Sequence, residues 1–255
     1  MSSPISTPAA PSSSARRGSG RVWRVVEAQH RVSTAKLTDT AAEQALLETL
    51  IEEAKPPIPP ECRHLDFLLF TPFRYAAPSP RGSRFRKPGF TAGVFYAAEN
   101  ADTAVAEICF HRILFFAESP ATPWPADAGE FTAFAVEYAT PLAIDLTRAP
   151  FDERGEVWQH PIDYTGCQAL AELARAEKIE AIKYASVRDP RRKLNVALLT
   201  CHAFARPEPV DRQSWRILFG SNGARALCDM PKETIDFGRA AFANDPRIGK
   251  VNWDR

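Results

Sequence analysis

The sequence predicts an α+β domain in which helices flank a mixed β core. Helical and strand-like segments both occur, they do not alternate regularly enough for a doubly wound parallel sheet, and a hairpin signal lies near the C-terminus. The chain has 255 residues, of which 45% are hydrophobic and 25% charged. This length and composition can bury a core and exclude collagen-like, coiled-coil and wholly disordered chains.

The N-terminal part divides into two expected segments. Residues 1–20 are mostly Ser, Pro, Ala and Gly, so they cannot bury enough surface to offset their ordering entropy, and we expect a disordered leader. Residues 21–64 are expected to form an N-terminal helical extension, because 40–55 carries apolar residues at helical spacing and is followed by a cluster of prolines. The main domain is then expected to span 65–255.

The main domain is predicted to contain helices and strands in mixed order. Helices are expected at 102–117, with Asp102 or Thr103 as N-cap, and at 165–178. Gly-Ser-Asn-Gly at 220–223 is typical of a hairpin turn. Apolar or alternating runs predict strands at 93–98, 131–138 with 142–146 as its neighbour, 181–184, 194–200, 215–219 and 224–228.

Global composition excludes several classes of function. The net charge of +1 gives no overall attraction to nucleic acid or to an anionic membrane. The five cysteines are scattered and form no C-x-x-C pair, so we expect reduced, buried thiols and no metal site. No apolar stretch approaches membrane-spanning length, and the N-terminus lacks a secretory signal. By elimination we expect a cytoplasmic protein without membrane contact.

One segment concentrates positive charge and aromatic rings. Residues 67–98 contain no acidic side chain, although the whole chain is nearly neutral. Guanidinium groups bind phosphate and aromatic faces stack on heterocycles, so the segment suits a nucleotide, or alternatively a nucleic-acid strand. A solvated basic loop beside a core strand fits the segment alone equally well. Its basic and aromatic residues are Arg74, Arg81, Arg84, Arg86, Lys87, Phe73, Tyr75, Phe85, Phe90, Phe95 and Tyr96.

Three polar residues further along are candidates for a site. Glu107 interrupts an apolar helix, where a carboxylate costs free energy unless it is paired or has a task. On composition alone, an exposed position or pairing with Arg112 explains Glu107 better. His111, one turn on, is expected to be a packed side chain, not a zinc ligand. Ser186 and Asn195 follow at strand ends, where each suits either hydrogen bonding to a sugar or amide, or turn formation.

The order of these residues resembles the RES family, the toxin half of RES–Xre toxin–antitoxin modules. The resemblance covers roughly 68–200 in patches, and their joint order carries it. Residues 81–86 depart from the family's Gly-Gly-Arg-Trp-Asn, so either Arg84 or Arg86 fills the arginine position. The matching patches are Phe73-Arg74-Tyr75, Gly82-Ser83-Arg84-Phe85, Val94-Phe95-Tyr96, Thr103-Ala104-Val105-Ala106-Glu107 with His111, then Ser186 and Asn195.

The resemblance implies an ADP-ribosyltransferase-like fold and an NAD-consuming enzyme. Members cleave the bond between nicotinamide and ribose, and pass ADP-ribose to water, phosphate or a protein. An Xre-family antitoxin is the implied protein partner. Carried over by position, Glu107, Arg84 and Tyr96 would be catalytic, and the NAD-binding residues would be Arg74, Tyr75, Arg84, Tyr96, Ser186 and Asn195.

The residue types suit this chemistry. Nicotinamide leaves as a neutral molecule, so the barrier lies in the cationic ribose, which a fixed carboxylate such as Glu107 stabilises. Arginines would hold the diphosphate, and a tyrosine would line the nicotinamide. Two other functions remain open: a nucleic-acid-binding module using 73–96, against which the net charge counts, and a binding protein that has lost activity.

Overall fold

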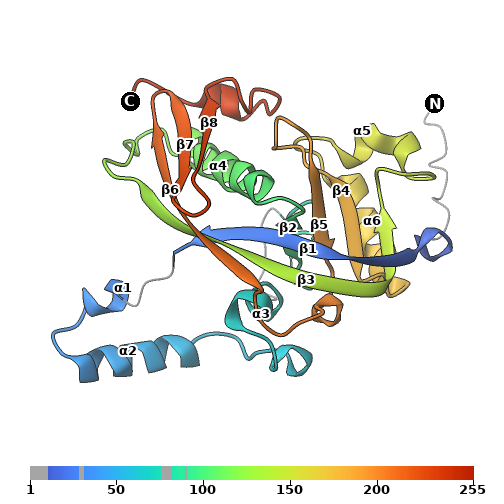
Figure 1. Cartoon of the computed structure of the whole chain (residues 1–255), viewed down its shortest axis with the longest axis horizontal. Helices are drawn as coiled ribbons and strands as arrows, with labels where there is room; N and C mark the ends of the chain where they lie inside the picture. The colour runs from blue at the N-terminus through green and yellow to red at the C-terminus, as the bar shows by residue number, and fades with distance from the viewer. Residues whose placement is uncertain (1–10, 29–31, 76–81, 90) are drawn as a thin grey trace.

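A mixed β-sheet forms the centre of the molecule (Figure 1). The computed structural model describes residues 11–28, 32–75, 82–89 and 91–255. Among these residues the sheet has eight strands in the order β1-β2-β5-β4-β3-β6-β7-β8. The strands are β1 (Arg16–Glu27), β2 (Phe95–Ala98), β3 (Gly129–Asp145), β4 (Ala181–Ala185), β5 (Leu194–Leu198), β6 (Asp211–Gly220), β7 (Gly223–Cys228) and β8 (Glu233–Gly238).

The long strand β3 organises the sheet. Along one edge it pairs antiparallel with β1, and along the other it pairs first with β6, antiparallel, and then with β4, parallel. Because β1 also pairs with β2, the strands β1, β2, β5, β4 and β3 close into a ring. Strands β6, β7 and β8 extend from this ring as an antiparallel meander.

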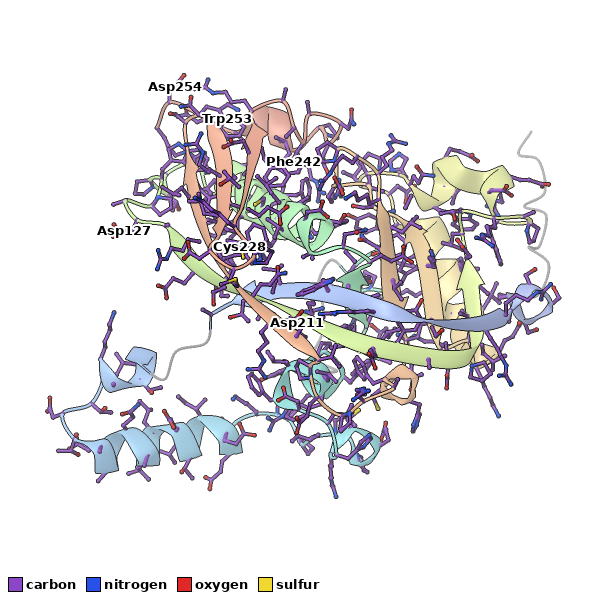
Figure 2. The ribbon with its side chains drawn as sticks, in the orientation of Figure 1. Asp127, Asp211, Cys228, Phe242, Trp253 and Asp254 are labelled. Carbon is purple, nitrogen blue, oxygen red and sulfur yellow. The ribbon has the colours of Figure 1, made fainter. Side chains whose placement is uncertain are left out.

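Helices cover the sheet in three places, and each has its own apolar cluster. The helix α4 packs against the β6–β8 meander and the C-terminal turns, where Phe110 meets Phe242 at 5.7 Å between ring centroids (Figures 1 and 2). The helix α3 packs on the ring near β2, and α6 packs beside β4. The helices are α1 (Val32–Ala35), α2 (Ala41–Glu53), α3 (Phe67–Arg74), α4 (Ala101–Glu118), α5 (Gly155–Trp158) and α6 (Thr165–Ala176).

The predicted α+β class is confirmed, and so are most of the predicted elements. The helices expected at 40–55, 102–117 and 165–178 correspond to α2, α4 and α6. The strands expected at 93–98, 181–184 and 194–200 correspond to β2, β4 and β5. The hairpin also forms, with Gly223 at a φ of +111° in its turn. A side chain at Gly223 would meet the carbonyl of Phe237 on β8, so glycine is required there.

The expected disordered leader is wrong for residues 11–20. Pro11–Ser14 forms a 3-10 turn, and β1 begins at Arg16 and pairs with β3. Residues 1–10 lie outside the described part of the chain. The composition of 1–20 is poor in apolar groups, but a strand gains its hydrogen bonds from its neighbour, which composition does not reveal. Residues 21–27, expected to belong to the N-terminal helical extension, also lie in β1, so that expectation is wrong for them and the sheet begins before the expected domain boundary at 65.

Two local predictions also need correction. Residues 142–146 were expected to form a neighbouring strand, yet they largely continue β3 itself beyond Pro141. The N-cap of α4 is Asn100, without a side-chain cap bond, in place of Asp102 or Thr103. Thr103 is buried and donates to the Asp189 carboxylate at 2.7 Å, so its hydroxyl is used in tertiary packing.

The helical extension has an exposed apolar face. Thr40 and Glu43 form a capping box that starts α2. Leu46 and Leu50 are nevertheless 60% and 53% exposed, because α2 projects from the body of the molecule (Figure 1). A helical period therefore predicted the helix correctly but did not indicate a buried face.

Two predictions concern the cysteines and membrane-spanning helices. All five cysteines are buried and free, as expected. Within the described ranges, no helix has the length and apolar character needed to cross a membrane.

Candidate functional site

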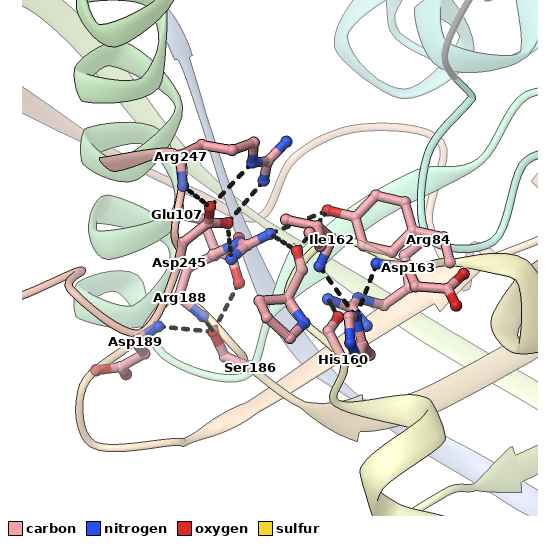
Figure 3. A network of polar contacts seen from close by, with 12 residues as sticks. Arg84, Glu107, His160, Ile162, Asp163, Ser186, Arg188, Asp189, Asp245 and Arg247 are labelled. Carbon is pink, nitrogen blue, oxygen red and sulfur yellow. Dashed lines mark hydrogen bonds and ion pairs between the residues drawn. The ribbon is translucent and has the colours of Figure 1, made fainter. Parts of the chain in front are cut away.

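Glu107 lies on α4 and faces the ends of β4 and β5 (Figure 3). Its Oε1 atom accepts a hydrogen bond from the Ser186 hydroxyl at 2.6 Å and another from the Asn195 amide at 2.7 Å. The three residues come from three different segments. Asn195 on β5 pairs with Tyr184 on β4, and Ser186 follows Tyr184 by two residues, on the same face. The structure thus brings together three of the residues predicted for the site.

Backbone geometry fixes the Ser186 hydroxyl as a donor to Glu107. Ser186 is fully buried just after β4, and its Oγ accepts from the backbone N–H groups of Arg188 and Asp189 at 3.2 and 2.9 Å. With these acceptor positions filled, the hydroxyl proton is directed to Glu107. Ser186 therefore orients the carboxylate and is not placed as a nucleophile.

The other carboxylate oxygen of Glu107 is available. Across the described ranges, no hydrogen bond or ion pair reaches its Oε2 atom, and the residue is only partly buried. The suggested pairing with Arg112 does not occur, because Arg112 forms its ion pair with Glu27 on β1. Asn195 Oδ1 is buried and has no hydrogen-bond donor in this structure. The site therefore presents two acceptor oxygens, one of them on an anion.

Phe85 contacts the rings of both Tyr96 and Tyr184, and Tyr184 lies close enough to Glu107 to be affected by its charge. The Tyr96 hydroxyl is 2.8 Å from Ser83 Oγ and accepts from the backbone N–H of Phe85 at 2.9 Å. Phe85 packs edge-on against Tyr184 at 4.9 Å between centroids. Burial raises the pKa of Tyr184 well above its ordinary value, and the charges of Glu107 and Tyr96 act in the same direction. Burial also raises the pKa of Tyr96, so both phenols are neutral near pH 7.

Arg84 is buried and bound to protein carbonyls. Its guanidinium donates to the carbonyls of Trp158 and His160 at 2.6 and 3.1 Å, and lies 4.8 Å from the centre of the Tyr164 ring. It therefore holds the 158–164 segment against the β2 side of the site. Gly82, at a φ of +62°, allows the tight turn that places Arg84, since a side chain there would strike the Arg86 carbonyl.

Arg74 and Tyr75 are placed differently from the prediction. Arg74 is buried at the end of α3, where it donates to the Glu52 carboxylate at 2.6 Å and to the Pro56 carbonyl at 2.5 Å. It thus joins α3 to the helical extension. Tyr75 ends α3, and its carbonyl accepts from Arg86 at 3.0 Å. No described contact joins either side chain to Glu107, Ser186 or Asn195.

The site contains an ionic cluster that the sequence did not indicate. Arg188 and Asp245 form a buried ion pair at 2.7 Å, and Arg247 also binds Asp245 (Figure 3). Burial opposes ionisation of Asp245, but the hydrogen bonds from Arg247 and the charges of both arginines together lower its pKa. Asp-Pro at 245–246 marks a turn, and nothing in the local sequence links it to Arg188, 57 positions earlier.

His111 lies one turn after Glu107 on α4, close enough to this cluster to be affected by its charges. Its side chain is exposed, with the ring 5.2 Å from that of Phe110, so the expectation of a packed side chain is wrong. Desolvation lowers the pKa of His111, Glu107 opposes this, and the arginines 188 and 247 reinforce it. In the described ranges no group of three or more His, Cys, Asp or Glu residues is arranged to hold a metal ion.

Two hollows differ in size and in position. The larger, about 490 Å³, lies on the β6–β8 meander, and none of the predicted residues lines it. The smaller, about 20 Å³, is lined by Phe110, Arg188, Phe242 and Asp245, next to the Glu107 site. The chemistry described above therefore lies beside the smaller hollow, which is too small for a nucleotide.

Comparison with known proteins places the chain in a family. The model of the RES domain matches residues 58–220. Among solved structures, the chain is similar to the one described as the crystal structure of the M. tuberculosis MbcT–MbcA toxin–antitoxin complex. The identity is 13% and the TM-score 0.44, over 78% of this chain and 85% of that one. Curated proteins give no match. The family match spans more than half of the sequence, and the chain belongs to the RES domain family.

Proposed function

We propose that this protein is the toxin of a type II toxin–antitoxin module, and that it consumes NAD by cleaving the bond between nicotinamide and ribose. Membership of the RES family supports an ADP-ribosyltransferase-like enzyme. The observation that carries the proposal is the fixed Glu107 carboxylate, with Oε1 held by Ser186 and Asn195 and with Oε2 open.

Glu107 acts on the ribose of NAD in this mechanism. As the C–N bond breaks, its electron pair leaves with the nicotinamide nitrogen, and positive charge develops on the ribose. Glu107 Oε2 accepts from a ribose hydroxyl and stabilises this charge electrostatically. Ser186 and Asn195 keep the carboxylate in place, so little reorganisation is needed when the charge develops.

The surrounding residues bind and orient the dinucleotide. Tyr96 and Tyr184, as neutral phenols, line the nicotinamide and ribose. Asn195 Oδ1 supplies an acceptor for a second hydroxyl or for the carboxamide. Arg84 positions the 158–164 segment beneath the substrate through its carbonyl bonds. An acceptor oxygen then bonds to the ribose carbon and loses its proton, which completes the transfer of ADP-ribose.

The alternative, nucleic-acid binding through 73–96, has weaker support. The guanidinium groups of Arg74, Arg84 and Arg86 donate to protein oxygens and do not form an exposed basic stripe. Arg81 lies outside the described residues. Binding of this kind would also depend steeply on salt and release no nicotinamide.

The test is incubation of the full-length protein with NAD labelled in its adenylate half, with and without cell extract. Nicotinamide release is expected in both reactions. Free labelled ADP-ribose would identify water as acceptor, its phosphorylated form would identify phosphate, and label on a protein band would identify transfer to a protein. Intact NAD in every reaction would refute the proposal.

The antitoxin is a further part of the proposal. We expect an Xre-family protein to bind this chain and cover the entrance to the Glu107 site, because a bound protein there would exclude NAD. Co-expression with the neighbouring-gene protein of that type, followed by purification and the same NAD assay, tests this. A stable complex without nicotinamide release is the expected result, and a complex with full activity would contradict it.

A further inference from the structure

A buried carboxylate clamped by two guanidinium groups lies next to the Glu107 site. Arg188 Nη1 donates to Asp245 Oδ2 at 2.7 Å, while Arg247 donates from Nε to Oδ1 at 2.9 Å and from Nη2 to Oδ2 at 2.7 Å. The side chains of Arg188 and Asp245 are only 5% and 2% exposed. Both oxygens of Asp245 are thus bound by forked donors, the geometry that also suits phosphate oxygens.

Arg188 connects the cluster to α4 one turn after Glu107. The Arg188 guanidinium carbon is 3.9 Å from the centre of the Phe110 ring, and Phe110 follows Glu107 by three residues on α4. The backbone N–H of Arg188 also donates to Ser186, which in turn donates to Glu107. A carboxylate for ribose and two guanidinium groups are therefore adjacent, as ribose and diphosphate are in a dinucleotide.

The cluster is positive even with Asp245 in place. Arg188 Nη2 donates to the Tyr164 hydroxyl at 2.9 Å, and Arg84 lies over the face of the same ring. Arg247 also lies close to Tyr164, so three guanidinium groups surround this residue. Asp245 binds Arg188 and Arg247, whereas Arg84 donates to backbone carbonyls. This excess of positive charge suits a ligand that carries more than one negative charge.

The space beside the cluster is nearly closed by the C-terminal segment. The hollow of about 20 Å³ is lined by Arg188 and Phe110 from one side, and by Phe242 and Asp245 from the other. Pockets for ligands of drug size or larger measure about 300–1,000 Å³. Binding of a diphosphate here therefore requires that the Asp245 side chain leave the two arginines while Arg247, two residues later, stays in place. Asp245 lies outside the family match at 58–220.

We propose that Arg188 and Arg247 bind the diphosphate of the substrate, and that Asp245 occupies this site as an internal carboxylate which the diphosphate displaces. The inference rests on the proposed function for the identity of the substrate. Asp245 then has two effects: it keeps the arginines folded and paired when substrate is absent, and it competes with substrate for them.

The test is calorimetric titration of inorganic pyrophosphate into the full-length protein in the absence of NAD. We compare the pyrophosphate affinity of the natural protein with that of Asp245→Asn, Arg247→Gln and the control Arg239→Gln. Arg239 pairs with exposed Asp254 in the same segment. We expect Asp245→Asn to bind pyrophosphate about tenfold more tightly, and Arg247→Gln about tenfold more weakly, each corresponding to one charge-assisted contact. The control should match the natural protein.

A different outcome would overturn the inference. If Asp245→Asn binds pyrophosphate equally or more weakly, Asp245 only positions the arginines and is not a competitor. Should Asp245→Asn fail to fold, Arg247→Gln decides, because Arg247 is 30% exposed and less central to the core. Unchanged pyrophosphate affinity in Arg247→Gln would then refute the site.

Failure of the inference can be told apart from failure of the proposed function. Nicotinamide release by the natural protein, together with pyrophosphate binding that neither variant alters, would refute the diphosphate site alone. The expected pyrophosphate shifts without nicotinamide release would refute the NAD reaction alone. A parallel titration with ADP-ribose distinguishes a nucleotide site from one for free phosphates, since a nucleotide site binds ADP-ribose more tightly than pyrophosphate.

Discussion

Two carboxylates accept hydrogen bonds from the 186–188 segment, and their surroundings differ. Glu107 is held by neutral donors, Ser186 and Asn195, that converge on one oxygen. Asp245 is held by two guanidinium groups that bind both of its oxygens. The Glu107 charge is therefore oriented but not neutralised, whereas that of Asp245 is already compensated. In the proposed function Glu107 therefore stabilises a cation in the ligand, and in the proposed diphosphate site an anion takes the place of Asp245.

The largest expected effect is on stability, at the buried ion pair of Arg188 and Asp245. Arg188→Met removes the buried partner of Asp245, and breaking such a pair from one side costs about 3–5 kcal/mol because a charge stays buried. The free energy of unfolding from urea titration measures this loss. Arg239→Gln, which breaks an exposed pair, should change it by less than about 1 kcal/mol. Equal losses in the two variants would show that the buried pair is not structurally important.

A smaller effect is expected on turnover, from the residues that hold the Glu107 carboxylate. Ser186→Ala removes one donor to Glu107, and a hydrogen bond to a charged group is worth about 1.5–3 kcal/mol, so kcat should fall roughly ten- to a hundredfold. Steady-state nicotinamide release from NAD measures kcat. A fall in the free energy of unfolding with unchanged kcat would mean that Ser186 serves only the backbone N–H groups of Arg188 and Asp189.

Arg84 separates structural from substrate-binding roles. Arg84→Ala leaves the Trp158 and His160 carbonyls without a donor, and we expect a loss of about 1–3 kcal/mol in the free energy of unfolding. Urea denaturation and the KM for NAD are measured together. A raised KM with unchanged stability would instead place Arg84 on the substrate, as the family resemblance implies.

The smallest expected effect is the pH dependence of stability. The pKa of Asp245 is lowered in the folded state from its ordinary value of 3.8, because the bonds from Arg247 and the charges of both arginines outweigh desolvation. Its contribution is therefore complete above that ordinary value and is lost as pH falls through the lower, folded value. Asp245→Asn should lose less stability than the natural protein over this acidic range. Parallel acid unfolding curves would contradict this.

The elements that the sequence predicted are those with a local signal. Helical spacing gave α4 and α6, and turn residues gave the β6–β7 hairpin. The start of β1 was missed because this Gly- and Ser-rich stretch becomes a strand only through its pairing with β3. The apolar half of β1, 21–27, was instead assigned to the helical extension. Similarly, helical spacing predicted α2 but not that its apolar face would be exposed.

The site residues also differ in whether the neighbouring sequence could identify them. Glu107 was singled out from its own helix, whereas Ser186 and Asn195 gained a role only through the order of family residues, and the structure joins all three. Arg74 illustrates the opposite case, since charge and the family resemblance both grouped it with Arg84, yet Glu52 binds it at the helical extension. Asp245 and Arg188 are brought together by tertiary packing, for which a single sequence carries no signal.

The most direct test of the account compares Glu107→Gln with the natural protein for nicotinamide release from NAD at saturating substrate. The substitution keeps the side-chain shape and removes the charge, so the unfolding temperature should stay close to that of the natural protein. We predict that kcat falls by about 10²–10³, the usual effect of losing one electrostatic stabiliser. Full turnover by a folded Glu107→Gln protein would contradict the central role of this carboxylate.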